Sequence, residues 1–136
     1  MRRIHRTGAW AMVQPYLESV DEEGETGTYV FGGEVSHAIR KGAILEPGRP
    51  ASDALDAGSH QRVGRADVDP ILAEFARAVV RSSLSVLYAR VDTAPGPEGT
   101  PVLLEFEATE PFLFLEHEPA AADRFATAVV DWLRAS

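Results

Sequence analysis

Between residues 25 and 41 the sequence reads ETGTYVFGGEVSHAIRK, which is the pattern of a β-hairpin. Apolar and β-branched residues stand on both sides of Gly32-Gly33, and a glycine pair between two such runs is typical of a two-residue turn. With this turn, the numbers of paired residues sum to 65, so we expect Glu25 to lie opposite Arg40. The hairpin therefore predicts antiparallel strand pairing.

Further strands and two helices are predicted on either side of this hairpin. An apolar run, interrupted by Pro15, predicts a buried strand that leads into a charged surface turn. Helix starts are indicated by Asp69-Pro70 and by Pro119, each followed by an amphipathic stripe. The expected elements are strands at 10–17, 86–91 and 102–108, a loop at 93–100, and helices at 70–83 and from 119 onward. We expect an α+β domain with a largely antiparallel sheet and helices packed on one face.

Residues 42–67 show little hydrophobic periodicity and contain four glycines and two prolines. So long a loop in a compact domain is usually either functional or disordered. We therefore expect a mobile loop here. Two hypotheses are equally open: a lid that closes over a ligand with Arg49, Arg62 and Arg65, or an insertion without a ligand role.

Composition limits the class of protein. The 136 residues suffice for one domain, and 21 acidic against 13 basic residues give a net charge of -8, which disfavours nucleic acid as a partner. The absence of cysteine excludes disulfides and thiolate chemistry and fits a reducing cytoplasm. No stretch approaches the roughly 20 apolar residues that cross a bilayer, and no signal peptide is indicated, so we expect no membrane partner.

The four histidines give little indication of chemistry. Their spacing does not resemble a metal site, so we expect ordinary surface or hairpin roles. Ser36 and His37 are also not expected to act as a nucleophile and its base, because neighbouring residues in a strand point to opposite faces.

Acidic residues alternate along the predicted strand at 102–108. Glu105 and Glu107 should share one face, and Arg90 and Asp92 should share a face of the neighbouring strand. Three carboxylates and one guanidinium on one face suit a magnesium ion and a polyphosphate. The alternative is a solvated strand surface with an ordinary Arg–Asp ion pair.

Five short motifs in these segments carry a resemblance to a known family. They are QPYL at 14–17, Gly24-Glu25, HAIRK at 37–41, ARVD at 89–92 and LEFE at 104–107. In this order they resemble the C-terminal half of an ATP-grasp ligase, over nearly all 136 residues. The most specific part is Ala-Arg-Val-Asp followed by Glu-x-Glu.

This resemblance implies a reaction and a metal site. In the family, ATP is bound between two α+β subdomains, and a substrate carboxylate is phosphorylated to an acyl phosphate that an amine or similar nucleophile attacks. By position, Asp92, Glu105 and Glu107 would bind magnesium or manganese, and Arg90 would approach the transferred phosphate. Glu107 stands where many relatives have asparagine, which adds a negative charge.

The resemblance also implies positions around the nucleotide. Gln14, Tyr16 and Leu17 would form the hinge that meets adenine. Glu25 would accept hydrogen bonds from the ribose hydroxyls. Arg40 or Lys41 would face the phosphates or the substrate carboxylate, and residues 42–67 would order over ATP.

The family's N-terminal lobe, with its glycine-rich loop and lysine, has no counterpart in the sequence. We therefore expect residues 1–136 to be a single partial domain that a missing lobe or a second chain completes, and the isolated chain to be inactive. The expected function is the C-terminal catalytic lobe of an ATP-dependent carboxylate–amine ligase that binds Mg-ATP. The alternative is a noncatalytic nucleotide-binding or protein-interaction remnant of the same fold.

Overall fold

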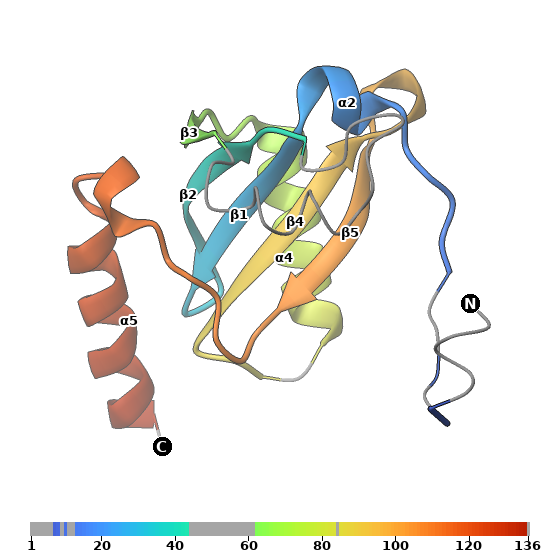
Figure 1. Cartoon of the computed structure of the whole chain (residues 1–136). Coiled ribbons are helices and arrows are strands. Elements are labelled where there is room, and N and C mark those ends of the chain that lie inside the picture. The colour runs from blue at the N-terminus through green and yellow to red at the C-terminus, as the bar shows by residue number, and fades with distance from the viewer. Residues whose placement is uncertain (1–6, 9, 11–12, 44–61, 84, 136) are drawn as a thin grey trace.

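The predicted hairpin lies inside a five-stranded antiparallel sheet with the order β3-β2-β1-β4-β5 (Figure 1). The computed structural model describes residues 7–8, 10, 13–43, 62–83 and 85–135. The strands are β1 (Glu25–Phe31), β2 (Glu34–Lys41), β3 (Val63–Ala66), β4 (Tyr88–Pro95) and β5 (Pro101–Glu107). Since β1 is central, it pairs with β2 along the chain and with β4 across a long connection.

The hairpin contains a β-bulge that changes its register. The predicted pairing holds for the two residue pairs next to the turn, but Ser36 is then left as an extra residue in β2. Beyond this bulge every partner shifts by one, so Glu25 lies opposite Lys41 and the predicted pairing with Arg40 is wrong. A bulge adds a residue to one strand only, and the alternation pattern used for the prediction assumes that none is present.

Two long helices accompany the sheet. They are α4 (Pro70–Ser82) and α5 (Ala121–Ala135), with the short helix α2 (Ser19–Glu23) and the 3-10 turns η2 (Pro97–Gly99) and η3 (Leu115–His117). The predicted start of α4 is confirmed, since the Asp69 carboxylate accepts a hydrogen bond from the Leu72 amide at 2.8 Å. No helix in the described ranges is long and apolar enough to cross a membrane.

The two long helices lie on opposite faces of the sheet. Val30 and Val91 pack with Val80 of α4 on one face, whereas Phe31 packs with Phe125 of α5 on the other. The α+β class and the antiparallel sheet are confirmed, but the expectation of helices on one face is wrong. Residues 108–118 run from the end of β5 to α5 and carry the chain to the second face (Figure 1). Because β1 is apolar on both faces, each face needs a cover.

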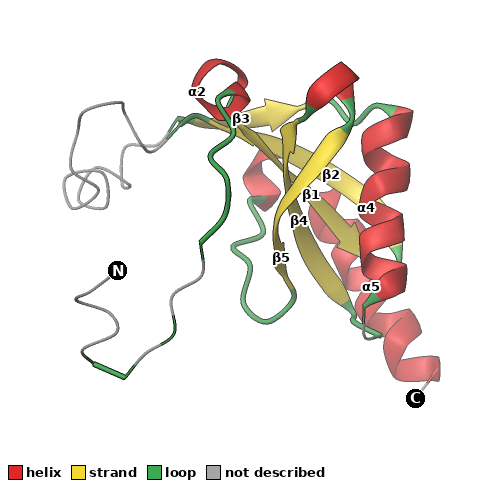
Figure 2. Ribbon diagram, turned by 90° about the vertical axis from the view of Figure 1, so that its right-hand side faces the viewer, coloured by secondary structure: helices red, strands yellow, loops and turns green. Residues whose placement is uncertain are grey.

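The segment before α2 is not the buried strand that the sequence predicts. Residues 13–17 form no regular element, and the side chain of Val13 is 66% exposed. Figure 2 shows this segment running away from the sheet. Pro15 cannot donate a ladder hydrogen bond, and the apolar run finds no strand to join among the described residues. The surface turn expected next to it is the helix α2.

The predicted loops are shorter than expected where they are described. β4 continues to Pro95, and Val63–Ala66 pairs with the end of β2 as β3. Residues 44–61 lie outside the described residues, so a lid in that range stays a prediction.

Candidate functional site

Six charged side chains gather on the sheet face that α5 covers at its other end. The alternation of β1, β2, β4 and β5 brings them together at the β1 start. We call this group the charged cluster; its members are Glu25, Lys41, Arg90, Asp92, Glu105 and Glu107. The prediction that Arg90, Asp92 and the two β5 glutamates share a face is confirmed.

Arg90 is the centre of the charged cluster. Its Nε donates to both carboxylate oxygens of Asp92 at 2.9 Å. Its Nη2 lies 3.2 Å from the nearest oxygen of Glu105 and 2.7 Å from that of Glu107. Burial alone would lower the pKa of Arg90, but the hydrogen bonds and charge of Asp92 outweigh burial and raise it. The guanidinium is therefore a fixed positive charge in contact with three carboxylates.

Lys41 bridges two carboxylates of the charged cluster, those of Glu25 and Asp92. Its Nζ lies 2.5 Å from a carboxylate oxygen of Glu25 and 3.0 Å from one of Asp92. Asp92 is 1% exposed and accepts from both Lys41 and Arg90. A carboxylate this deeply buried is stable as an anion only with such partners.

Gly27 leaves the space in which these ion pairs form. It lies directly opposite Asp92 in the sheet. A Cβ placed on Gly27 would lie 2.8 Å from Asp92 Oδ1 and 3.3 Å from Arg90 Cδ. Residue-type reasoning missed Gly27, although a glycine inside a strand can mark a close approach of other groups.

Comparison with known proteins identifies a relative of this chain. No protein-family model matches the sequence. The chain is 38% identical over 141 residues to the cycloserine biosynthesis protein DcsG of Streptomyces lavendulae, which covers 97% of this chain and 45% of that protein. The crystal structure of D-cycloserine synthetase DcsG superimposes with a TM-score of 0.73 at 36% identity, over 88% of this chain and 41% of DcsG.

More distant structures share the fold alone. The ATP-grasp ligase PsnB, complexed with a minimal precursor, Mg and ADP, has a TM-score of 0.51 at 15% identity, over 76% of this chain and 33% of PsnB. D-alanine–D-alanine ligase from Bacillus anthracis, complexed with ATP, has a TM-score of 0.52 at 17% identity, over 85% of this chain and 38% of that ligase. The chain is thus a relative of DcsG and has the fold of part of the ATP-grasp ligases. It spans less than half the length of these relatives.

The structure separates the other ATP-grasp positions from the charged cluster. Arg40 lies on the opposite face of the sheet from Lys41. Its Nη1 donates to the Glu23 carbonyl at 2.7 Å. Gln14, Tyr16 and Leu17 lie on the segment before α2, where the Tyr16 hydroxyl donates to Asp21. Among the described residues, no hydrogen bond or ion pair joins these four side chains to the charged cluster.

The donor chemistry of the charged cluster fits the metal used by ATP-grasp relatives. Carboxylate oxygens are the ligands that Mg²⁺ and Mn²⁺ prefer, and four carboxylates facing two cations leave an excess of two negative charges. Within the described ranges, no group of three or more acidic or histidine side chains has a geometry that could hold a metal ion. Arg90 and Lys41 lie between the carboxylates, so a bound ion would need these side chains to rearrange.

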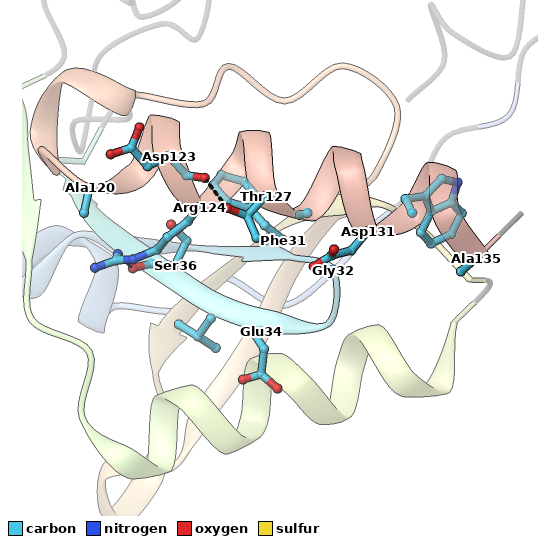
Figure 3. A pocket seen from close by; sticks show the side chains of 13 residues that line it. Phe31, Gly32, Glu34, Ser36, Ala120, Asp123, Arg124, Thr127, Asp131 and Ala135 are labelled. Carbon is cyan, nitrogen blue, oxygen red and sulfur yellow. Dashed lines mark hydrogen bonds between the residues drawn. The ribbon is translucent and has the colours of Figure 1, made fainter.

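A separate cavity of about 570 Å³ lies between α5 and the hairpin turn (Figure 3). Among its lining residues are Ser36, Arg124 and Asp131, and it shares none with the charged cluster. Arg124 donates to the Ser36 carbonyl and lies 3.5 Å from Glu118, while Asp131 pairs with Arg134. Because the cavity contains none of the residues that the ATP-grasp resemblance assigns to ATP or metal, the charged cluster is the better candidate site.

His37, which is buried, forms an uncharged pair with the partly buried Ser36 on the same sheet face as the charged cluster. The Leu113 carbonyl can only accept, so His37 Nε2, 2.9 Å away, carries the proton. His37 Nδ1 then accepts from the Ser36 hydroxyl at 3.0 Å. The expectation that Ser36 and His37 point to opposite faces is therefore wrong, because Ser36 is the bulge residue. Burial lowers the pKa of His37, with Glu118, Arg124 and His117 as its charged or titratable neighbours.

This pKa predicts that acid destabilises the folded chain through His37. The unfolded chain binds the proton more readily, so the contribution of His37 is complete above pH 6.5, its ordinary value, and is lost as the pH falls through the lowered pKa. We expect the free energy of unfolding to fall more steeply between pH 7 and pH 5 in the wild type than in His37→Gln. Urea denaturation at each pH measures this difference, and parallel pH profiles would contradict the prediction.

Proposed function

We propose that this chain is the C-terminal catalytic lobe of an ATP-dependent carboxylate–amine ligase that acts through an acyl phosphate. The proposal rests on one observation, the contact of Arg90 with three carboxylates on one face of the sheet. Transfer of a phosphoryl group depends mainly on positioning and on neutralising charge. Arg90 is fixed and positively charged, which suits it to stabilise the phosphoryl group as it moves.

The charged cluster would divide these tasks among its members. Asp92, Glu105 and Glu107 would hold Mg²⁺, which supplies charge neutralisation when bound. Lys41 would orient Asp92 and, once released from it, face the phosphates or the substrate carboxylate. Arg40 is a weaker candidate for that role, because it lies on the other face of β2.

The remaining partners follow from the family. Gln14, Tyr16 and Leu17 would meet adenine from the segment before α2, and Glu25 would accept from the ribose hydroxyls in place of its contact with Lys41. The substrates would be ATP, a small carboxylate and an amine or similar acceptor. The rest of the ATP site would come from another lobe or chain, since phosphates need groups on more than one side.

A noncatalytic remnant of the fold is the second candidate. One observation favours it: all four carboxylates of the charged cluster already have a cationic partner in the chain. Such a cluster could serve folding alone. The two candidates differ in whether the excess negative charge attracts a divalent cation.

Mn²⁺ tests this difference directly, because its paramagnetism broadens the NMR signals of nearby amides even when binding is weak. We expect Mn²⁺, titrated into the chain, to broaden the amides around residues 92, 105 and 107 first, and Glu105→Gln to weaken this binding about tenfold. Glu34→Gln is the matched control, since Glu34 is 80% exposed and lies outside the charged cluster. Equal binding in both variants, or broadening spread evenly over the acidic surface, would favour the remnant.

A further inference from the structure

Arg90 belongs to a row of four side chains that crosses the sheet. His37 of β2 pairs with Tyr29 of β1, Tyr29 pairs with Arg90 of β4, and Arg90 pairs with Glu107 of β5. Cross-strand partners on one face are immediate neighbours. The row therefore connects the uncharged interior under α5 to the charged cluster.

The first two members of the row are buried and stacked. Tyr29 is 0% and His37 4% exposed, and their rings lie 4.4 Å apart at an angle of 8°. Neither ring can move without disturbing the other or the core residues around it, Phe31 and Ile39. The stack thus forms a rigid wall next to Arg90.

Both rings donate to the segment that follows β5. We call residues 108–118, which run from β5 to α5, the strap (Figure 1). The Tyr29 hydroxyl donates to the Phe112 carbonyl at 2.9 Å, and His37 Nε2 donates to the next carbonyl, Leu113, at 2.9 Å. These two bonds tie consecutive strap residues to the sheet.

The two donors keep their protons at neutral pH. Burial raises the pKa of Tyr29, and the positive charge of Arg90 offsets this rise only in part. The phenol therefore remains protonated. The Leu113 carbonyl fixes the tautomer of His37, as described above. Uncharged donors add no further charge beside Arg90, which leaves its guanidinium directed to the carboxylates.

We propose that Tyr29 and His37 are positioning residues that hold Arg90 in its place, because their stacked rings form the wall beside it and their hydrogen bonds to the strap keep that wall fixed. This inference rests on the proposed function, in which Arg90 serves phosphoryl transfer. Arg90 has a long, flexible side chain that is only 11% exposed. The carboxylates restrain its guanidinium, and the row restrains its stem on the side of Tyr29.

Tyr29→Phe tests the proposal, because it removes one hydroxyl and keeps the stacked ring. We expect the Arg90 Nε proton, which donates to Asp92, to exchange with solvent at least tenfold faster in Tyr29→Phe. The amides of His117 and Glu118, bonded within the strap, should also exchange faster. Mn²⁺ affinity, measured as above, should fall about threefold. His37→Leu should have the same effects. In His37→Gln, whose amide can still donate, these effects should be much smaller than in His37→Leu.

Tyr88→Phe is the matched control. Tyr88 lies on the same face, and its hydroxyl donates to another strap carbonyl, that of Thr109, at 3.0 Å. It pairs with Phe31 and lies outside the row of Arg90. We expect the exchange of the Arg90 Nε proton to be unchanged in Tyr88→Phe.

Three results separate the possibilities. Exchange of the Arg90 Nε proton within twofold of wild type in both Tyr29→Phe and His37→Leu would overturn the positioning role. Equal acceleration in Tyr29→Phe and Tyr88→Phe would also overturn it, because loss of overall stability would then explain the effect. Faster exchange in Tyr29→Phe alone, with no localised Mn²⁺ binding even in the wild type, would support the positioning of Arg90 and reject the proposed function.

Discussion

Replacing Arg90 by leucine is expected to lower the free energy of unfolding by about 3 kcal/mol. Among the described residues, the substitution leaves Asp92, which is 1% exposed, with Lys41 as its one cationic partner, and leaves Glu105 and Glu107 without the cation they contact here. Removing one partner from a buried ion pair costs more than the pair contributes, because the remaining charge stays desolvated. Urea denaturation followed by circular dichroism measures the loss.

Two further variants show whether the buried charge causes this loss. Arg81→Leu removes the same side chain from an exposed pair with Glu74, 2.6 Å away, and should change stability little. Adding Asp92→Asn to Arg90→Leu removes the uncompensated charge and should restore at least 1 kcal/mol. Equal losses in the two leucine variants would mean that the charged cluster is no more than a surface arrangement.

Gly27→Val is expected to destabilise the chain by about 2 kcal/mol and to weaken Mn²⁺ binding. The new side chain would meet Asp92 Oδ1 at 2.8 Å, and Asp92 cannot move away because Lys41 and Arg90 both hold it. Valine favours β-strands in general, so a loss of stability here would come from the crowded contact. Thermal unfolding and the Mn²⁺ titration measure the two effects.

Gly64→Val is the matched control for Gly27→Val. Gly64 also lies inside a strand, β3, but a Cβ there meets no atom within 4 Å. Its replacement should be neutral or slightly stabilising, because a residue with a side chain loses less backbone freedom on folding. A comparable loss at both glycines would argue against Gly27 as the gap in the charged cluster.

Local patterns were enough to predict much of the fold. The glycine pair at residues 32–33 and the cap at Asp69 act over a few residues, so the hairpin and the start of α4 were predicted correctly. The placement of α5 depends on both faces of β1 needing a cover, which only the assembled sheet reveals. The segment at 13–17 is apolar enough for a strand, yet an apolar run forms one only where a neighbouring strand offers hydrogen bonds.

The candidate site was predictable only in part for a similar reason. Strand alternation places Arg90, Asp92, Glu105 and Glu107 on one face, and this holds because β4 and β5 stay in register over these residues. Lys41, and not Arg40, lies opposite Glu25 in the charged cluster because β2 contains a single extra residue. Tyr29 and Gly27 have ordinary residue types for a strand or a turn, and their importance comes from neighbours far away in the sequence.

The strand order has a consequence for how the chain folds. β1 and β2 are joined by a two-residue turn, and a hairpin of this kind forms within about 1–10 μs. Pairing of β1 with β4 must wait for the slower closure of the intervening chain. Only this pairing brings Asp92 of β4 to Lys41 at the end of β2, 51 positions away. During that interval Lys41 can meet Glu25 but not Asp92. We therefore expect the hairpin to be native in early intermediates and the charged cluster to be completed only when the centre of the sheet closes.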